Sequence, residues 1–209
     1  MKNGWIKAVL IAAMLLTAAA IAYVAHLFVE EIRLEKRKAE YPVHYADLIE
    51  ASAKAFSLDP YLVLSVMRCE SSFDADAVSP RGARGLMQIM PDTGAWIAHK
   101  LDMDDTYTEE MLFTPAVNVR FGCWYLQFVS GRFDGRTMEM LAAYNAGHGT
   151  VEGWLTDGAY SANGALTVIP YESTALYYDR VIAAMQEYRA LYPDLFSGDG
   201  EAIVETPAA

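Results

Sequence analysis

The longest apolar segment of the chain lies near its N-terminus. No charged residue occurs from Ala8 to Val29, and polar side chains interrupt this run only at Thr17 and His26. As an α-helix with a rise of about 1.5 Å per residue, the run measures about 33 Å. This length matches the roughly 30 Å hydrocarbon core of a bilayer. We therefore predict a transmembrane anchor over residues 1–30.

A cleaved signal peptide is the alternative interpretation of this segment. Lys2 and Lys7 form a basic start, and the alanines at 18–20 offer small residues to a peptidase. The apolar run nevertheless continues to Val29, whereas the hydrophobic region of a signal peptide usually ends after about 7–15 residues. The continuation favours an anchor that stays attached.

Residues 31–44 are charged, lack a clear periodicity and end near the Tyr41-Pro42 pair. This composition predicts a juxtamembrane stalk that leads into a folded domain. Basic residues lie on both sides of the apolar run, so the positive-inside rule alone does not decide which side of the membrane the domain occupies.

Downstream of the stalk, apolar residues recur at helical spacing, and Pro60 and Pro115 each follow a residue that can cap a helix. We predict helices over the approximate ranges 48–56, 60–70, 115–128, 92–100, 137–146 and 171–192. No segment alternates apolar and polar residues over the length of a strand. The domain from 45 to 192 is therefore predicted to be mostly α-helical, with at most a small β-hairpin near Val78–Gln88.

After Pro193 the chain consists largely of Ser, Gly, Asp, Glu, Thr, Pro and Ala. This composition predicts a disordered tail over residues 193–209.

The formal net charge of −11 argues against a nucleic-acid partner, which requires a basic stripe to neutralise phosphates. The two cysteines, Cys69 and Cys123, are too few and too widely spaced for a zinc site. We therefore expect no metal and no cofactor. The two cysteines are a candidate disulfide outside the membrane, although buried free thiols are equally common.

One charged residue occupies an unusual position. Val63, Val66, Met67 and Glu70 follow each other at the spacing of one helix face, so the carboxyl of Glu70 falls on an apolar stripe. Partial burial and the negative end of the helix dipole both raise the pKa of such a carboxyl. A carboxylic acid that stays protonated near neutral pH is what glycosidic bond cleavage requires. A surface glutamate at a fraying helix end is the alternative.

Separated motifs then occur in a fixed order: Glu70-Ser71-Ser72-Phe73, Ser79, Gly85-Leu86-Met87-Gln88-Ile89-Met90-Pro91, Ala143-Tyr144-Asn145-Ala146-Gly147 and Ile169-Pro170-Tyr171-Glu172-Ser173-Thr174. Together they resemble the lytic transglycosylase family with the SLT domain of the lysozyme-like superfamily, from about Tyr45 to Tyr188. The resemblance implies a goose-type lysozyme-like helical domain. It also implies cleavage of the β-1,4 bond between N-acetylmuramic acid and N-acetylglucosamine without water, leaving a 1,6-anhydromuramyl end.

The resemblance implies that Glu70 acts as the single catalytic acid and base. The substrate-binding residues that it implies are Ser79, Gly85, Gln88, Met90, Tyr144, Asn145 and Tyr177. Asp74 and Asp76 are the nearest other acids, and we interpret them as ordinary loop residues.

The chain departs from the family pattern in the last motif. The family commonly has glutamate and arginine where this chain has Ser173 and Ala175, and Glu172 lies one residue before the usual glutamate position. This leaves open how the function of that glutamate is met. His148 stands where the family often has proline, and it is predicted to lie in a loop.

The implied chemistry places the domain outside the cell membrane, which gives a single-pass protein with an extracytoplasmic domain. Its expected partners are the glycan strands of peptidoglycan, the membrane, and candidate proteins of wall synthesis or of a secretion apparatus. Two alternatives remain at this stage: a noncatalytic glycan-binding scaffold, and a muramidase that uses water.

Overall fold

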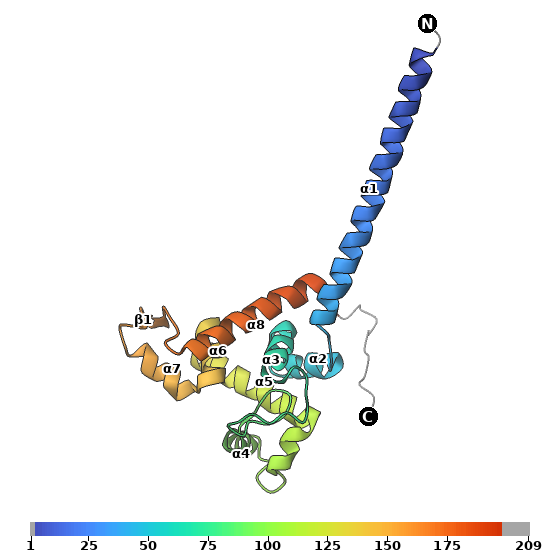
Figure 1. Ribbon diagram of the computed structural model, residues 1–209. Coiled ribbons are helices and arrows are strands. Elements are labelled where there is room, and N and C mark those ends of the chain that lie inside the picture. Colours follow the sequence, from blue (N-terminus) through green and yellow to red (C-terminus); the bar gives the residue numbers. More distant parts are fainter. Residues whose placement is uncertain (1–2, 198–209) are drawn as a thin grey trace. The chain divides into compact units, whose positions relative to one another are not determined.

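The computed structural model describes residues 3–197, which divide into two compact units between Pro42 and Val43. The first unit contains helix α1 (Gly4–Glu40), and the second contains all the other elements (Figure 1). Of the tail predicted over 193–209, residues 198–209 lie outside the described residues.

Helix α1 is continuous for 37 residues and therefore includes most of the predicted stalk. Arg33 pairs with Glu30 and Lys38 with Glu35 at a spacing of three residues, an arrangement that stabilises an exposed helix. Arg37 and Lys38 in the last turn also complement the helix dipole. These local interactions explain why the charged segment continues the helix.

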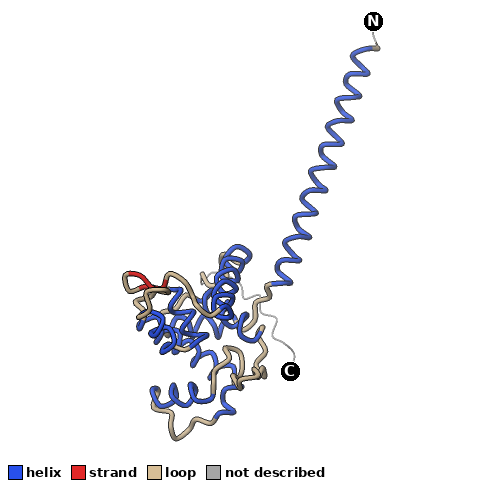
Figure 2. The backbone as a smooth tube through the Cα atoms, turned by 60° about the vertical axis from the view of Figure 1, so that its left-hand side comes forward, coloured by secondary structure: helices blue, strands red, loops and turns tan. Residues whose placement is uncertain are grey.

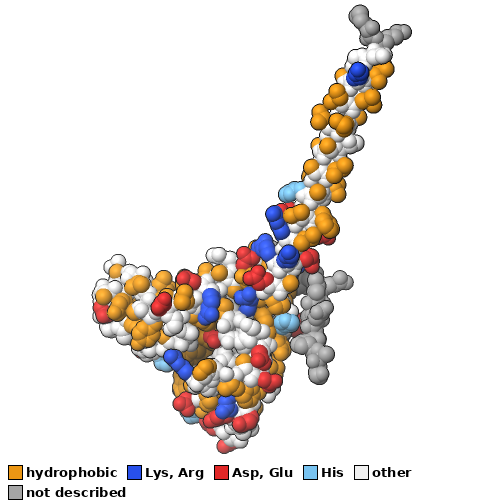
Figure 3. All heavy atoms as spheres, in the orientation of Figure 1, with side chains coloured by type: hydrophobic (Ala, Val, Ile, Leu, Met, Phe, Trp, Pro, Cys, Tyr) orange, Lys and Arg blue, Asp and Glu red, His pale blue; other side chains and the backbone are white. Residues whose placement is uncertain are grey.

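Among the described residues, α1 is the helix that is long and apolar enough to cross a membrane. None of its residues is buried, and Figure 3 shows hydrophobic side chains along most of its length, with charged side chains gathered toward its C-terminal end. These features are consistent with membrane anchoring. An N-terminal signal sequence has the same composition, so retention of the anchor stays a prediction.

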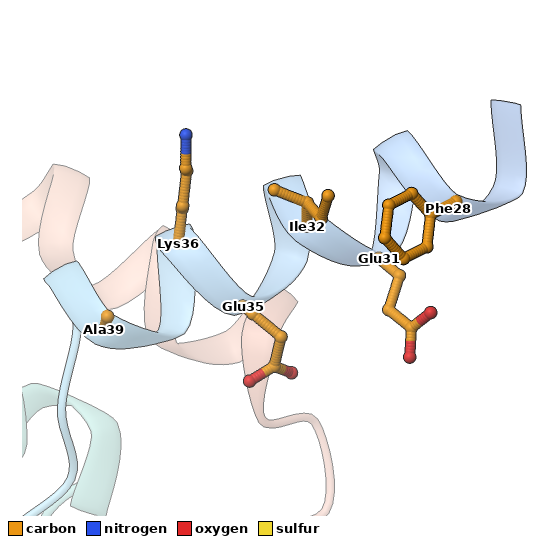
Figure 4. A pocket seen from close by; sticks show the side chains of 6 residues that line it. All are labelled: Phe28, Glu31, Ile32, Glu35, Lys36 and Ala39. Carbon is orange, nitrogen blue, oxygen red and sulfur yellow. The ribbon is translucent and has the colours of Figure 1, made fainter. Parts of the chain in front are cut away.

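A shallow hollow lies on the surface of α1, lined by Phe28, Glu31, Ile32, Glu35, Lys36 and Ala39 (Figure 4). The carboxylates of Glu31 and Glu35 point to one side of the helix, and Lys36 points to the opposite side. The hollow is a space between side chains of a single helix, and all the residues that line it belong to the first unit.

The second unit is built almost entirely from helices (Figures 1 and 2). They are α2 (Ala46–Ala55), α3 (Pro60–Ser71), α4 (Pro91–Lys100), the 3-10 helix η1 (Glu109–Phe113), α5 (Pro115–Arg132), α6 (Thr137–Ala146), α7 (His148–Leu155) and α8 (Glu172–Leu191). The prediction of a mostly helical domain is confirmed.

The helix starts at Pro60 and Pro115 are also confirmed. The Asp59 carboxylate accepts a hydrogen bond of 2.9 Å from the backbone N–H of Tyr61 and so caps α3. Thr114 makes no equivalent side-chain bond at the start of α5.

Helix α3 is deeply buried in the domain. All its residues from Leu62 to Met67 are buried, including Ser65, whose hydroxyl bonds to the Tyr61 carbonyl within the same helix. Burial on every side requires neighbouring elements around the helix, and α2 and α8 pack against it. Because α3 is held in this way, the position of its C-terminal end is well defined.

The β-hairpin lies elsewhere than predicted. Strands β1 (Ser161–Ala162) and β2 (Ala165–Leu166) pair antiparallel, whereas the segment 78–88 makes only isolated bridges at Arg84 within the described residues. Asn163 and Gly164 both have positive φ, of 54° and 77°, which is the turn chemistry of a two-residue hairpin. The short strands gave no alternating pattern, and so the turn was the only signal available.

The loop predicted around His148 is wrong, because His148 is the first residue of α7. Gly147 separates α6 from α7 with a φ of 88°, a conformation that favours glycine. The chain therefore turns within one residue and continues as a helix.

Candidate active site

Glu70 is the penultimate residue of α3, and its side chain is half-buried. The helix ends at Ser72, which adopts a left-handed conformation with a φ of 53°. Next to Glu70, the Ser71 hydroxyl donates a hydrogen bond of 2.8 Å to the Leu86 carbonyl. This bond holds the end of α3 against the loop 85–91, so the carboxyl is placed beside that loop.

The environment of Glu70 favours the protonated acid. Burial raises the pKa of its carboxyl from 4.5 to about 7. The Tyr177 hydroxyl and the positive charge of Arg180 act in the opposite direction and limit the rise in pKa. At neutral pH the group is therefore balanced between donating and accepting a proton.

Two tyrosines lie beside this carboxyl: Tyr177, which is buried, and Tyr144, which is half-buried. Burial, together with the charge of Glu70, raises the pKa of both Tyr144 and Tyr177 well above the ordinary value, so both stay neutral. The Tyr144 hydroxyl donates to the Met87 carbonyl at 2.9 Å. The Tyr177 hydroxyl makes no hydrogen bond of standard geometry within the described residues. Its proton is therefore available to the Glu70 carboxylate.

The loop 85–91 carries two of the predicted substrate-binding side chains, Gln88 and Met90. The Gln88 side-chain amide donates to the carbonyls of Ala77 and Gly85, at 3.2 and 3.0 Å, which fixes the side chain. Its oxygen accepts no hydrogen bond from the part of the chain that the structure describes. Met90, at the end of the loop, is 39% exposed. The loop thus presents a fixed amide and an exposed thioether.

Gly85 has a structural reason to be glycine. Its φ is 72°, and a Cβ at this position would lie 2.2 Å from the Leu112 carbonyl oxygen and 2.5 Å from the Asn118 side-chain nitrogen. The Gly85 backbone is therefore packed directly against Leu112 of η1 and Asn118 of α5. A contact of Gly85 with substrate stays a prediction.

Asn118 of α5 holds the loop 85–91 in place through its side-chain hydrogen bonds. This residue was not identified from the sequence. Its side chain accepts from the Met87 N–H at 2.7 Å and donates to the carbonyls of Arg84 and Leu112, at 2.8 and 2.7 Å. The side chain is fully buried. Its signal in the sequence was a polar residue one helical turn before Phe121, on the buried side of α5.

Ser79 forms a tight turn. Its hydroxyl accepts from the Ala83 N–H at 3.0 Å, and its carbonyl accepts from the Gly82 N–H at 2.9 Å. Within residues 3–197 these bonds of Ser79 stay inside the turn, and its hydroxyl proton has no acceptor there. Its role toward substrate is still a prediction.

Asn145 is exposed at the end of α6 and is oriented by a residue of α8. The hydroxyl of the buried Thr174 donates to the Asn145 side-chain oxygen at 2.8 Å. With its oxygen engaged, Asn145 presents its two N–H groups outward. The last motif of the chain thereby sets the orientation of an amide in an earlier one.

If Asn145 binds the glycan strand as the resemblance implies, the Thr174→Val variant should raise the peptidoglycan concentration for half-maximal rate about fivefold, because Asn145 loses an orienting hydrogen bond worth about 1 kcal/mol. Valine keeps the shape of threonine but cannot donate. The Thr174→Ser variant keeps the hydroxyl and is expected to behave as the wild type in the same rate measurement. Equal effects of the two substitutions would contradict the positioning role of the hydroxyl.

In the last motif, where the chain departs from the family pattern, Glu172 and Ser173 lie on the exposed first turn of α8. Ala175 is half-buried. The positive charge that acts on Glu70 comes instead from Arg180. Sequence reasoning missed Arg180, although it follows Tyr177 by three residues and thus lies on the same side of the helix.

Cys69 and Cys123 are both free thiols, so the disulfide that the sequence left open is not formed in this structure. Burial raises the pKa of the Cys123 thiol to about 12, which makes it unreactive. Between residues 3 and 197, no group of three His, Cys, Asp or Glu side chains is placed to hold a metal ion.

The fold and the site together define a class of protein. A buried helix ends in a half-buried acid, a fixed loop and two neutral phenols lie beside that acid, and the domain is mostly helical with one small hairpin. This is a lysozyme-like domain.

The family model of the Transglycosylase SLT domain matches residues 47–164. A soluble lytic murein transglycosylase of Salmonella typhimurium is 32% identical over 82% of this chain and 26% of the relative. The membrane-bound lytic murein transglycosylase C of Histophilus somni is 35% identical over 51% of this chain and 32% of the relative. The chain belongs to the SLT lytic transglycosylase family.

Solved structures agree with this assignment. The 70 kDa soluble lytic transglycosylase of Escherichia coli superimposes with a TM-score of 0.67 and 31% identity, over 74% of this chain and 25% of that chain. The Slt of Pseudomonas aeruginosa, solved as an inactive mutant in which glutamine replaces a glutamate, gives 0.66 and 29%, over 90% and 31%. The chain spans about a quarter to a third of the length of these relatives.

Proposed function

We propose that this protein is a membrane-anchored lytic transglycosylase that cleaves the β-1,4 bond between N-acetylmuramic acid and N-acetylglucosamine in peptidoglycan. The product is a 1,6-anhydromuramyl end, formed without water. The observation that carries the proposal is Glu70, whose pKa is raised by burial to about 7, with no second carboxylate among the groups that shift it. A hydrolase of the usual type requires two carboxylates on either side of the bond.

The neighbouring acids support a single-carboxylate mechanism. Asp74 and Asp76 are both exposed, and the Asp74 carboxylate accepts the Asp76 N–H at 2.9 Å. Such a bond stabilises a turn. Neither acid therefore replaces the second carboxylate of a hydrolase.

In the proposed mechanism, the protonated Glu70 first donates its proton to the glycosidic oxygen, and the bond from that oxygen to C1 of muramic acid breaks. The 6-hydroxyl oxygen of the same sugar then forms a bond to C1. Glu70, now a carboxylate, accepts the proton of that hydroxyl. Each cycle thus returns the acid to its starting state.

Tyr177 and Arg180 support the carboxylate stage of this cycle. Both interact favourably with ionised Glu70 and lower its pKa, whereas burial raises it. A carboxyl that is buried without these partners would hold its proton too strongly to release it to the leaving oxygen at low cost. The two residues therefore adjust the acid to both steps.

The amide groups of the site suit an acetamido sugar. Among the described residues, the Gln88 side-chain oxygen and the Asn145 side-chain N–H groups have no hydrogen-bond partner. One can accept from the N–H of an N-acetyl group, and the other can donate to its carbonyl. Ser79, Gly85, Met90, Tyr144 and Tyr177 complete the proposed set of substrate contacts.

The proposal places the domain on the extracytoplasmic side, where peptidoglycan lies, with α1 as a single membrane span. The apolar composition of α1 supports the anchor. A relative from Histophilus somni is named a membrane-bound transglycosylase. The proposed partners are glycan strands and proteins of wall synthesis or of a secretion apparatus.

Mass spectrometry of the muropeptides that the full-length protein releases from purified peptidoglycan in detergent tests the proposal. Products with anhydromuramyl ends are expected. Products heavier by one water would identify a muramidase. Absence of products, together with binding to peptidoglycan, would identify a glycan-binding scaffold.

Activity is expected to decline as the pH rises above about 7, because the acid that starts the reaction loses its proton there. The Tyr177 hydroxyl lowers the pKa of Glu70, so its removal in Tyr177→Phe raises that pKa and moves the decline to higher pH. Muropeptide release measured between pH 4.5 and 9 checks both statements. Tyr178→Phe, at the next position of α8, is the matched control and should leave the profile unchanged. A shift to lower pH in Tyr177→Phe would contradict the assigned role.

A further inference from the structure

Five aromatic side chains from three helices form a second feature of the domain, which we name the aromatic cluster: Trp96 of α4, Trp124, Tyr125 and Phe128 of α5, and His148 of α7. The ring centroid of Trp96 lies 5.1 Å from that of Trp124 and 5.0 Å from that of Phe128. The His148 ring lies at 6.3 Å from Trp96 and within 24° of parallel.

The rings of the aromatic cluster are accessible to solvent. Trp96, Trp124 and His148 are half-buried, as is Phe128, whereas Tyr125 is only 8% exposed and forms the base. Aromatic residues that only fill the core of this domain, such as Phe133, are almost fully buried. The cluster therefore leaves part of its large apolar area in contact with water.

The cluster is continuous with the catalytic site. Tyr125 lies 5.6 Å from Tyr144 and 6.3 Å from Trp96, measured between ring centroids. Tyr144 in turn interacts with Glu70. Two ring-to-ring contacts thus lead from the phenol beside the catalytic acid to the half-buried Trp96.

We propose that the aromatic cluster is a saccharide-binding subsite, in which an N-acetylhexosamine unit of the glycan strand packs against the solvent-accessible parts of Trp96 and Trp124, whose ring planes lie 79° apart. This inference rests on the proposed function and extends it from the cleaved bond to a neighbouring sugar. The two faces of a pyranose ring carry C–H groups, and an indole ring offers a large flat surface to them.

The cluster itself contains no carboxylate, ammonium or guanidinium group. Arg132 and Glu152 form an ion pair near His148. The exposed cations Lys100 and Arg120 lie one helical turn from Trp96 and Trp124, so they flank the rings. The rings themselves therefore suit the uncharged sugar of peptidoglycan, and the free stem peptide is the competing ligand that the test includes.

Fluorine NMR tests the inference directly. The full-length Glu70→Gln variant, labelled with 5-fluorotryptophan in detergent, carries four labelled tryptophans: Trp5, Trp96, Trp124 and Trp154. Addition of the N-acetylglucosamine tetrasaccharide is expected to shift the signals of Trp96 and Trp124 in a saturable manner. Trp154, which is 7% exposed and packs against Tyr171, should not shift. Unchanged Trp96 and Trp124 signals, or shifts caused only by a free stem peptide, would overturn the inference.

A rate measurement separates this inference from the proposed function. Trp96→Ala is expected to raise the peptidoglycan concentration for half-maximal rate about tenfold, through the loss of one stacking surface. Trp154→Phe is the control variant and should not change it. Wild-type rates in Trp96→Ala would refute the subsite while leaving the proposed function intact. Absence of muropeptides from the wild type would refute the function, and the fluorine shifts would still decide whether the cluster binds saccharide.

Discussion

The Glu70→Gln variant is expected to lose muropeptide release by about 10²–10⁴-fold, because glutamine cannot transfer a proton in either step. The amide keeps the size of the carboxylic acid, so binding of peptidoglycan should persist. Measurement of released muropeptides and of sedimentation with insoluble peptidoglycan checks both halves of this prediction.

The stability of this variant provides a control with a defined sign. The carboxyl of Glu70 has its pKa raised from 4.5 to about 7 in the folded protein. The folded state therefore holds the proton more tightly, and ionisation destabilises it as the pH rises through this window. At pH 8 the free energy of unfolding of Glu70→Gln should equal or exceed that of the wild type, and the difference should be at most about 3 kcal/mol. At pH 4 the two should be equal.

Asp76→Asn is the matched control for charge removal, since Asp76 is an exposed carboxylate in the loop that follows α3. It should retain wild-type activity. Retained activity in Glu70→Gln, or equal loss in both variants, would show that the acid has been assigned to the wrong residue.

The second large effect is expected in Gly85→Ala, which should lower the free energy of unfolding by on the order of 4 kcal/mol. The added Cβ would lie 2.2 Å from a backbone carbonyl oxygen, which cannot move aside as the tip of a side chain can. The positive φ of 72° adds strain. Because the loop 85–91 lies beside Glu70, activity should fall as well.

The Gly82→Ala variant separates the cost of backbone strain from the cost of steric overlap with the added Cβ. Gly82 has a φ of 86°, but a Cβ there has nothing within 4 Å. Its cost should be limited to about 1–2 kcal/mol for the left-handed conformation. Denaturant unfolding of the full-length proteins, followed by near-ultraviolet circular dichroism, compares the two variants. Equal losses would mean that the packing against Leu112 and Asn118 is not what requires glycine at position 85.

Local signals predicted a large part of the fold. Proline at the first helical position set the starts of α3 and α5, and the ranges predicted for α6 and α8 agree with the structure to within one residue. Helix starts and amphipathic faces depend on residues within one or two turns, so a sequence contains them in full. The hairpin and α7 were missed because their signals are single turn residues, Asn163-Gly164 and Gly147.

For the site, the sequence by itself determined that Glu70 lies on an apolar helical stripe, which gives the direction of its pKa shift. Only the tertiary structure decided its partners. Tyr177 and Arg180 act on Glu70 from α8, more than 100 residues away, and Thr174 reaches Asn145 across two helices.

The buried Asn118 and the aromatic cluster likewise combine residues from separate elements. Helical spacing states which residues share a face of one helix, but it contains no information on which other helix packs there. The choice of packing partner depends on how the whole core fills its volume. The sequence was therefore enough to predict the catalytic acid, whereas its neighbouring residues could be identified only from the tertiary structure.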